Sequence, residues 1–280
     1  MKTAVIDVGG GLRGIYGAGV FDLCMDRGIS FDCCIGVSAG SANIASFLSR
    51  QRGRNFTFYY EYSFKKEYMS LGNYISKGSY FDLDYVYTTL SGSDGQKPID
   101  YEAFSENPAE FIIVASEAVS GKGKYFTKAD ISRDNFDVLK ASSAIPVVCR
   151  PYEINGVKYF DGGLFDPVPI KKAESEGCDK IVLILTRPID HDRSPSKDIK
   201  LAQVLHKHYP VAAHNLRLRA KRYNDAVHYA LELQKEGKAL VIAPDDISGV
   251  DTMKKSREAL LRLYGKGYGD GCKIISFMEQ

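Results

Sequence analysis

Ser38 lies in a sequence motif that often carries a catalytic serine. Ser38 is the centre of a G-x-S-x-G pentapeptide that runs from Gly36 to Gly40. The apolar residues 31–35 before it predict a strand, and residues 39–50 after it predict a helix. A serine on a sharp strand-to-helix turn exposes its hydroxyl, and small neighbours are needed where the backbone is strained. We interpret Ser38 as a nucleophile; the alternative is an ordinary turn.

A second glycine-rich turn precedes the first predicted helix, residues 15–26, and follows an apolar strand over residues 3–8. Its residues are Gly9, Gly10, Gly11, Leu12, Arg13 and Gly14. Backbone N–H groups in such a turn can hold an oxyanion, because glycine has no side chain to block the approach. Arg13 adds a positive charge beside this hole, or else pairs on the surface.

The same turn also satisfies the G-x-G-x-x-G pattern of dinucleotide-binding proteins. That interpretation requires an acidic residue at the end of the second strand to bind the ribose. The candidate, Asp32, precedes the second strand, so its carboxylate should lie at the wrong edge of the sheet. Two glycine-rich turns at the carboxyl ends of the first two strands can instead face one cleft. A hydrolase is therefore favoured over a nicotinamide-dependent oxidoreductase.

A serine nucleophile needs a proton acceptor, and the histidines are poorly placed to be one. All five follow residue 190: His191, His206, His208, His214 and His228. Four of them fall in polar, basic helices and are expected at the surface. His191, in the polar loop after a predicted strand at 181–185, is the least implausible of the five.

Asp161 is the better candidate for the base. Asn155-Gly156 is a strong hairpin signal, and Asp161 ends the second strand of that hairpin. Gly162 and Gly163 leave room around its carboxylate. The alternative is an aspartate that caps the next helix. Burial should raise the pKa of Asp161 towards the working pH, as a carboxylate base requires.

Taken in order, these motifs resemble those of the patatin-like phospholipase family. Residues 9–14 match its oxyanion motif, residues 36–40 its nucleophile elbow and residues 161–163 its D-G-[GA] motif. Residues 141–146, Ala-Ser-Ser-Ala-Ile-Pro, resemble its A-S-x-A-x-P block. The resemblance spans about residues 1–190. One departure is Asp166, where relatives often have asparagine.

The resemblance implies a three-layer α/β/α fold and hydrolysis of lipid acyl esters, in phospholipid or lysophospholipid, by a Ser-Asp dyad without histidine, metal or cofactor. Ser38 would attack the acyl carbonyl and Asp161 would take its proton. The glycine turn from Gly9 to Gly11, with Arg13, would hold the oxyanion. The remaining motif glycines would have structural roles: Gly14, Gly36, Gly40, Gly162 and Gly163. A non-catalytic lipid- or acyl-binding protein on the same fold is the alternative from another class.

The pattern of elements independently predicts one α/β domain over residues 1–280. Further buried strands are expected at 111–115, 181–185 and 239–243. Helices are expected near residues 132–142, 167–177, 199–208, 210–236 and 252–264, with a surface loop at 190–197. Buried strands that alternate with helices indicate a mostly parallel sheet covered on both faces. The region after residue 197 is expected to be largely helical.

An aromatic-rich insertion, about residues 55–96, interrupts this alternation. Twelve aromatic side chains and three lysines lie between residues 56 and 87. Tyrosine suits the wall of an apolar pocket, because its ring is apolar and its tip is polar. Simple packing of the insertion against the sheet is the commoner role of aromatic residues. We predict that the segment faces the site and admits acyl chains.

Composition excludes several other classes of protein. A net charge of +2 gives no reason to expect nucleic acid as a partner. The six cysteines lack the spacing of a zinc site and are expected to be free thiols. Neither a secretory signal nor an apolar run long enough to span a membrane is visible. We therefore expect a cytoplasmic protein with at most peripheral membrane contact.

Overall fold

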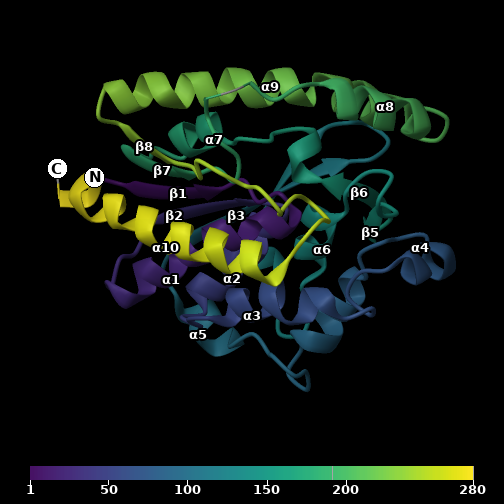
Figure 1. The fold of residues 1–280 in the computed structure, drawn as a ribbon, viewed down its shortest axis with the longest axis horizontal. Coiled ribbons are helices and arrows are strands. Elements are labelled where there is room, and N and C mark those ends of the chain that lie inside the picture. Colours follow the sequence, from purple (N-terminus) through teal and green to yellow (C-terminus); the bar gives the residue numbers. More distant parts are fainter. Residues whose placement is uncertain (191, 280) are drawn as a thin grey trace.

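Eight strands form one sheet in the computed structural model, which describes residues 1–190 and 192–279 (Figure 1). The order across the sheet is β5-β6-β3-β2-β1-β7-β8, and β4 pairs with β3. The strands are β1 (Thr3–Asp7), β2 (Cys33–Val37), β3 (Glu110–Glu117), β4 (Gly123–Thr127), β5 (Tyr152–Ile154), β6 (Val157–Asp161), β7 (Lys180–Ile184) and β8 (Ala239–Ile242).

The centre of the sheet is parallel, and one side of it is antiparallel. β1 pairs in parallel with β2 and β7, β2 with β3, and β7 with β8. β4 and β6 run antiparallel to β3, and β5 runs antiparallel to β6. Every residue of β2 and β7 is buried, which is why these strands are nearly continuous apolar runs.

Helices cover both faces of the sheet. They are α1 (Ile15–Asp26), α2 (Ala39–Leu48), α3 (Arg54–Tyr60), α4 (Leu71–Lys77), α5 (Tyr101–Glu106), α6 (Asp137–Ser143), α7 (Ile170–Ser175), α8 (Ser196–Leu205), α9 (Pro210–Lys235) and α10 (Arg257–Glu279). One face packs against α1, α2 and α10, and the other against α7 and α9 (Figure 1). Alternate strand residues face the two layers: Val5 and Cys34 on one side, Ile6 and Ile35 on the other. This three-layer α/β/α arrangement confirms the expected fold class.

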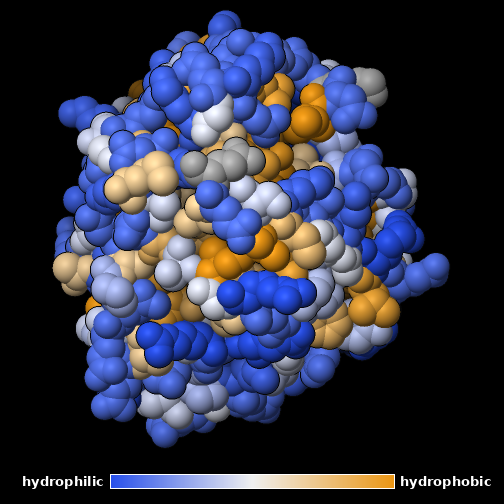
Figure 2. All heavy atoms as spheres, turned by 90° about the vertical axis from the view of Figure 1, so that its left-hand side faces the viewer, coloured by the Kyte–Doolittle hydropathy of each residue, from blue (hydrophilic) through white to orange (hydrophobic). Residues whose placement is uncertain are grey.

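The parallel strands give the molecule two different ends. Figure 2 shows the end at which both termini lie, and its surface is largely hydrophilic with scattered hydrophobic patches. β1 begins at this end, so it carries the amino ends of the parallel strands (Figure 1). The turns that follow β1 and β2 therefore lie at the opposite, carboxyl edge of the sheet, where α/β proteins bind ligands.

The last helix differs most from the sequence prediction. Residues 252–264 were expected to form it, but α10 begins at Arg257 and continues to Glu279. The region beyond residue 264 is rich in glycine, which disfavours a helix. Packing overrides this preference: a Cβ at Gly267 would overlap the carbonyl of Tyr16 on α1, and a Cβ at Gly19 would overlap the carbonyl of Tyr264. The glycines let α1 and α10 touch backbone to backbone.

Other boundaries shift by a few residues. The helix expected at 132–142 begins only at Asp137, and α8 begins at Ser196, inside the expected surface loop. β2 continues two residues past Ile35. β4 and α5 were not predicted at all. β4 forms a hairpin with β3 across residues 118–122, but only one of its residues is buried, so it lacks the apolar run by which the other strands were predicted.

The described part of the chain contains no helix with both the length and the apolar character to cross a bilayer.

Candidate active site

Ser38 occupies a strained turn between β2 and α2. Its backbone has φ +57° and ψ −132°, a conformation that is uncommon for a residue other than glycine and is often found at functional sites. A Cβ at Gly36 would lie 2.5 Å from the Cα of Ser41, and one at Gly40 would overlap the carbonyl of Asp7. Gly36 is therefore needed for the end of β2 to pack against α2, and Gly40 for α2 to pack against β1.

The block at residues 141–146 supports this turn from α6. The amide of Ser38 donates a hydrogen bond to the hydroxyl of Ser142, 2.9 Å away. The same hydroxyl lies 3.0 Å from that of Ser41 on α2. Ser142 thus fixes the backbone of the turn and the first turn of α2 together.

Asp161 comes to Ser38 from a distant part of the chain. It ends β6 and pairs with Ala115 on β3. Its carboxylate accepts a hydrogen bond from the amide of Gly163 at 2.8 Å, and it lines the same recess as Ser38. A Cβ at Gly162 would overlap the carbonyl of Val114, so glycine is required for this close approach to β3.

Burial raises the pKa of Asp161 above the usual aspartate value. The neighbouring side chain of Ser38 and the hydrogen bond from the amide of Gly163 oppose the shift, as do the positive charges of Arg219 and Arg193. A raised pKa makes the carboxylate a stronger proton acceptor, which is the direction expected for a general base.

Two hydrogen bonds of Gly9 fix the backbone of the glycine turn after β1. The amide of Gly9 donates to the carboxylate of Asp7 at 2.8 Å, and its carbonyl accepts from the hydroxyl of Thr186. Gly9, Gly10 and Gly11 all have positive φ, at 62°, 120° and 62°. The amides of Gly10 and Gly11 donate to no residue that the structure describes, so they are available to a substrate oxygen.

Arg13 lies beside this turn and is only 5% exposed, so the alternative of a surface ion pair is wrong. Its guanidinium donates to the hydroxyl of Thr252 at 3.2 Å. A Cβ at Gly10 would lie 2.8 Å from Nη2 of Arg13. Burial, followed by the charge of Arg187, lowers the pKa of Arg13 to about 9.

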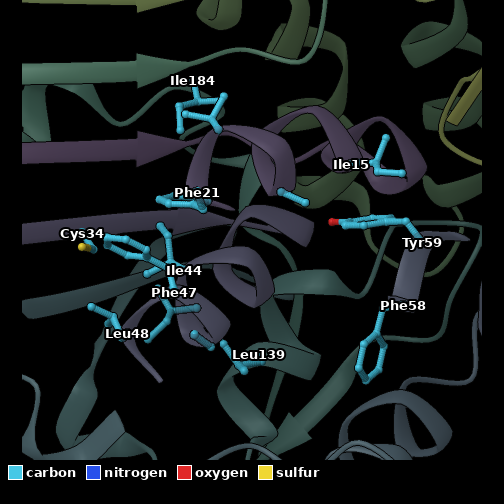
Figure 3. Packing of buried hydrophobic residues seen from close by; sticks show 14 of the residues in the cluster. Ile15, Phe21, Cys34, Ile44, Phe47, Leu48, Phe58, Tyr59, Leu139 and Ile184 are labelled. Atoms are coloured by element: carbon cyan, nitrogen blue, oxygen red, sulfur yellow. The ribbon is translucent and has the colours of Figure 1, made fainter. Parts of the chain in front are cut away.

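Four supporting residues were not found from the sequence: Asp7, Asn43, Tyr59 and Thr186. Asp7 is fully buried, and burial raises its pKa to about 6. The side-chain amide of Asn43 donates to the carboxylate of Asp7 and to the carbonyl of Gly14, both at 2.8 Å. The hydroxyl of Tyr59 points into the core (Figure 3) and donates to Asn43 at 3.0 Å. The one feature of the sequence that could have indicated this group is Asp7, a carboxylate at the end of an apolar strand.

A narrow apolar cavity of about 70 Å³ opens on one side of Ser38. Much of its wall comes from the aromatic-rich insertion, which contributes Phe58, Tyr59, Tyr68, Phe81 and Tyr87. These side chains also belong to, or pack against, the main core, as Figure 3 shows for Phe58 and Tyr59. Pocket wall and core packing are therefore two roles of the same residues.

A wider recess of about 390 Å³ opens on the other side of Ser38. The glycine turn and Asp161 line one part of it. The other part is lined by residues from beyond β7, among them Arg193, Arg219 and Thr252. Ser38, Gly11 and Ile145 border both the cavity and the recess.

The sequence profile described as patatin-like phospholipase matches residues 8–173, more than half of the chain. The chain belongs to the patatin-like phospholipase family. A second profile, a domain of unknown function (DUF6363), matches residues 209–280. The carboxyl-terminal part of this patatin-like protein thus carries a match of its own, but one to which no activity is attached.

Several relatives are similar to this patatin-like protein over part of their length. The uncharacterised protein YjjU of Escherichia coli is 30% identical over 192 residues, which are 67% of this chain and 52% of YjjU. Lysophospholipase NTE1 of Candida albicans is 25% identical over 198 residues, 67% of this chain and 13% of that protein. An uncharacterised NTE family protein of Mycobacterium tuberculosis is 28% identical over 82 residues, 29% of this chain and 22% of that protein. The chain thus spans about half the length of YjjU and less of the others.

The fold is also similar to that of a solved protein. The crystal structure of VipD from Legionella pneumophila superposes with a TM-score of 0.50, over 98% of this chain and 67% of VipD. Sequence identity is only 14%, so the likeness concerns the patatin-like fold alone.

No described histidine lies at the site of this patatin-like protein. His206, His208, His214 and His228 are exposed, and none lines the cavity or the recess. His191, the remaining candidate, lies outside the described residues.

Asp32 is equally remote from the site. Its carboxylate accepts hydrogen bonds from the amide and hydroxyl of Thr3, at 2.7 and 2.9 Å, where β1 begins. It therefore lies at the amino edge of the sheet, which confirms the sequence-based expectation. A dinucleotide at the glycine turn would find no ribose-binding carboxylate in Asp32.

Proposed function

We propose that this chain is a serine acyl hydrolase that cleaves carboxylic ester bonds of phospholipid or lysophospholipid. The observation that carries the proposal is the convergence of Ser38 and Asp161, which come from separate elements, in one recess beside the amides of Gly10 and Gly11, which have no described acceptor. The family description and the name of the Candida albicans relative, a lysophospholipase, support a lipid ester as substrate.

The first half of the reaction transfers the acyl group to the enzyme. The Ser38 hydroxyl attacks the ester carbonyl carbon, and its proton passes to the Asp161 carboxylate. The amides of Gly10 and Gly11 then stabilise the negative oxygen of the tetrahedral intermediate, and Arg13 adds positive charge beside them. Collapse of this intermediate breaks the bond to the alcohol oxygen, which takes the proton back from Asp161 as it leaves.

The second half releases the acid. Water attacks the ester that now links the acyl group to Ser38, and Asp161 accepts a proton from that water. The same amides hold the second oxyanion. Ser38 then leaves with the proton from Asp161, and the fatty acid is freed. The amino end of α2 begins directly after Ser38, and its positive dipole end favours negative charge at this point in both halves.

Contact with a lipid surface is a further part of the proposal. The chain between Tyr68 and Phe81, two residues of the cavity wall, carries α4. α4 exposes Leu71 and Ile75, at 66% and 78%, and ends at Lys77. Ile75→Asp should weaken co-sedimentation with anionic vesicles relative to the unaltered protein; equal sedimentation would remove α4 from the proposal.

A fluorophosphonate probe tests the nucleophile directly. The unaltered protein should be labelled, and mass spectrometry of its peptides should place the label on Ser38. Ser38→Ala should take no label, whereas Ser105→Ala, a change at an exposed serine on α5, should be labelled normally. Labelling or ester turnover by Ser38→Ala would refute the assignment. An unreactive wild-type protein that still binds lipid would favour the non-catalytic alternative.

A further inference from the structure

The region of unknown function supplies one wall of the recess beside Ser38. Arg219 and Tyr223 reach it from α9, and Asp251 and Thr252 from the segment before α10. This segment is docked on the glycine turn, since the amide of Leu12 donates to the carbonyl of Thr252 at 3.3 Å. The carboxyl-terminal region therefore shapes the space on the side of Ser38 opposite the apolar cavity.

Positive charge dominates this recess. Its cationic side chains are Arg13, Arg187, Arg193, Lys197 and Arg219, and its carboxylates are Asp161, Asp198 and Asp251. The cations thus outnumber the carboxylates even with Asp161 ionised.

The two other carboxylates are already engaged. Asp198 has a side chain only 1% exposed, and both Arg193 and Arg219 pair with it. Asp251 pairs with Lys197 at 4.0 Å and also accepts a hydrogen bond from the amide of Met253 at 2.9 Å. Neither carboxylate is left to neutralise Arg187, which forms no hydrogen bond or ion pair with a described residue.

Buried cations normally have an anionic partner, but Arg13 forms no ion pair with a described residue. Nε of Arg13 is buried and finds no hydrogen-bond acceptor among the described residues. Burial and the neighbouring arginines lower the pKa of both Arg13 and Arg193, to about 9 and about 10. A bound anion would remove this repulsion and fill the open hydrogen-bonding position.

We propose that the recess binds the phosphate of a net-anionic lipid headgroup, and that Arg187, Arg193 and Arg219 select such substrates over neutral and zwitterionic ones. A zwitterionic headgroup would bring an ammonium group to a recess whose free charges are cationic, so it gains less than an anionic headgroup. This inference rests on the proposed acyl hydrolase function. It gives the carboxyl-terminal region a role in recognising the alcohol part of the ester, while the apolar cavity receives the acyl part.

Three esters with the same decanoyl chain test the inference: monodecanoylglycerol, decanoyl-lysophosphatidylcholine and decanoyl-lysophosphatidylglycerol, each in solution below its micelle concentration. Wild type should show the highest kcat/KM on the anionic ester. Arg187→Gln should lower the ratio of anionic to neutral kcat/KM by about 10-fold or more, as expected for one lost charge-assisted hydrogen bond. Arg217→Gln, at an exposed position on α9, is the matched control and should keep the ratio.

The possible outcomes distinguish failure of the headgroup site from failure of the proposed acyl hydrolase function. Because every comparison is a ratio within one protein preparation, partial misfolding of a variant does not imitate selectivity. Equal kcat/KM on all three esters, or a ratio unchanged in Arg187→Gln, overturns the headgroup site but leaves the hydrolase intact. Inhibition of the neutral reaction by inorganic phosphate without any substrate preference assigns the recess to free phosphate and also overturns it. Failure of wild type on all three esters overturns the proposed function itself.

Discussion

The two spaces that meet at Ser38 differ in size, chemistry and origin. The cavity is narrow and lined by aromatic side chains from the insertion after α2. The recess is several times larger, carries five cationic side chains and is closed by segments from beyond β7. The same serine borders both, so it stands where an apolar environment changes to a charged one. An amphiphilic ester has its carbonyl at the equivalent boundary, between tail and headgroup, and this match is what the following predictions test.

The largest effect is expected at Asp161, which lines the recess beside Ser38. Asp161→Asn should lower kcat by about 10²–10⁴-fold, the usual cost of losing a general base. Because only the ionised carboxylate accepts a proton, the wild-type rate should rise with pH through the raised pKa of Asp161 and level off above it. The variant should lose this rise. Both are measured with a water-soluble aryl ester.

The matched control is Asp166→Asn, three residues beyond the D-G-[GA] motif, where the carboxylate accepts a hydrogen bond from Tyr125 at 2.7 Å. It should retain most of the rate. His191→Ala should also cost little. A large loss in His191→Ala together with near-normal Asp161→Asn would replace the dyad with a Ser-His-Asp triad.

The second largest effect is expected for Gly10→Ala, a change in the wall of the recess. Its φ of 120° is unfavourable for alanine, and the new Cβ would lie 2.8 Å from Arg13 and from Thr186. The amide should therefore leave its position, and loss of one oxyanion donor typically costs about 10²–10³-fold in kcat. KM should change less, because the oxyanion exists only in the transition state and intermediate. A folded variant with unchanged kcat would mean that this glycine serves only the turn.

The cavity side should give a smaller and selective effect. Ala42→Leu adds bulk to the cavity wall on α2 and should exclude part of a long acyl chain. Each excluded CH₂ is worth up to about 0.8 kcal/mol, so three or four methylenes correspond to about 10²-fold in kcat/KM. The butanoyl ester should be affected much less than the decanoyl ester of the same alcohol. Equal losses on both, with a lower Tm, would mean that the cavity is only part of the core.

The catalytic motifs could be predicted from the sequence because each depends on local backbone geometry. A strand followed by G-x-S-x-G predicts a tight turn from local sequence alone, and the glycine run after β1 predicts a second one. The alternation of apolar runs and helices likewise gave the parallel sheet. Since both turns follow adjacent parallel strands, their meeting at one edge was also predictable.

Interactions between distant segments were decided only by the tertiary structure. Asp7, Asn43 and Tyr59 form one buried hydrogen-bonded group under the glycine turn, although 52 residues separate the first from the last. α10 continues through its glycines because close contact with α1 outweighs their poor helix propensity.

The cavity and the recess were likewise decided only by the tertiary structure. The aromatic cluster was visible in the sequence, but which of its rings face Ser38 depends on how α3 and the following chain fold over α2. Arg187 and Arg219 give no recognisable spacing, because they converge on the glycine turn from different segments that the sheet brings together. Local sequence therefore determined the reacting groups, whereas three-dimensional packing decided what surrounds them, since desolvation and charge depend on neighbours in space and not in the chain.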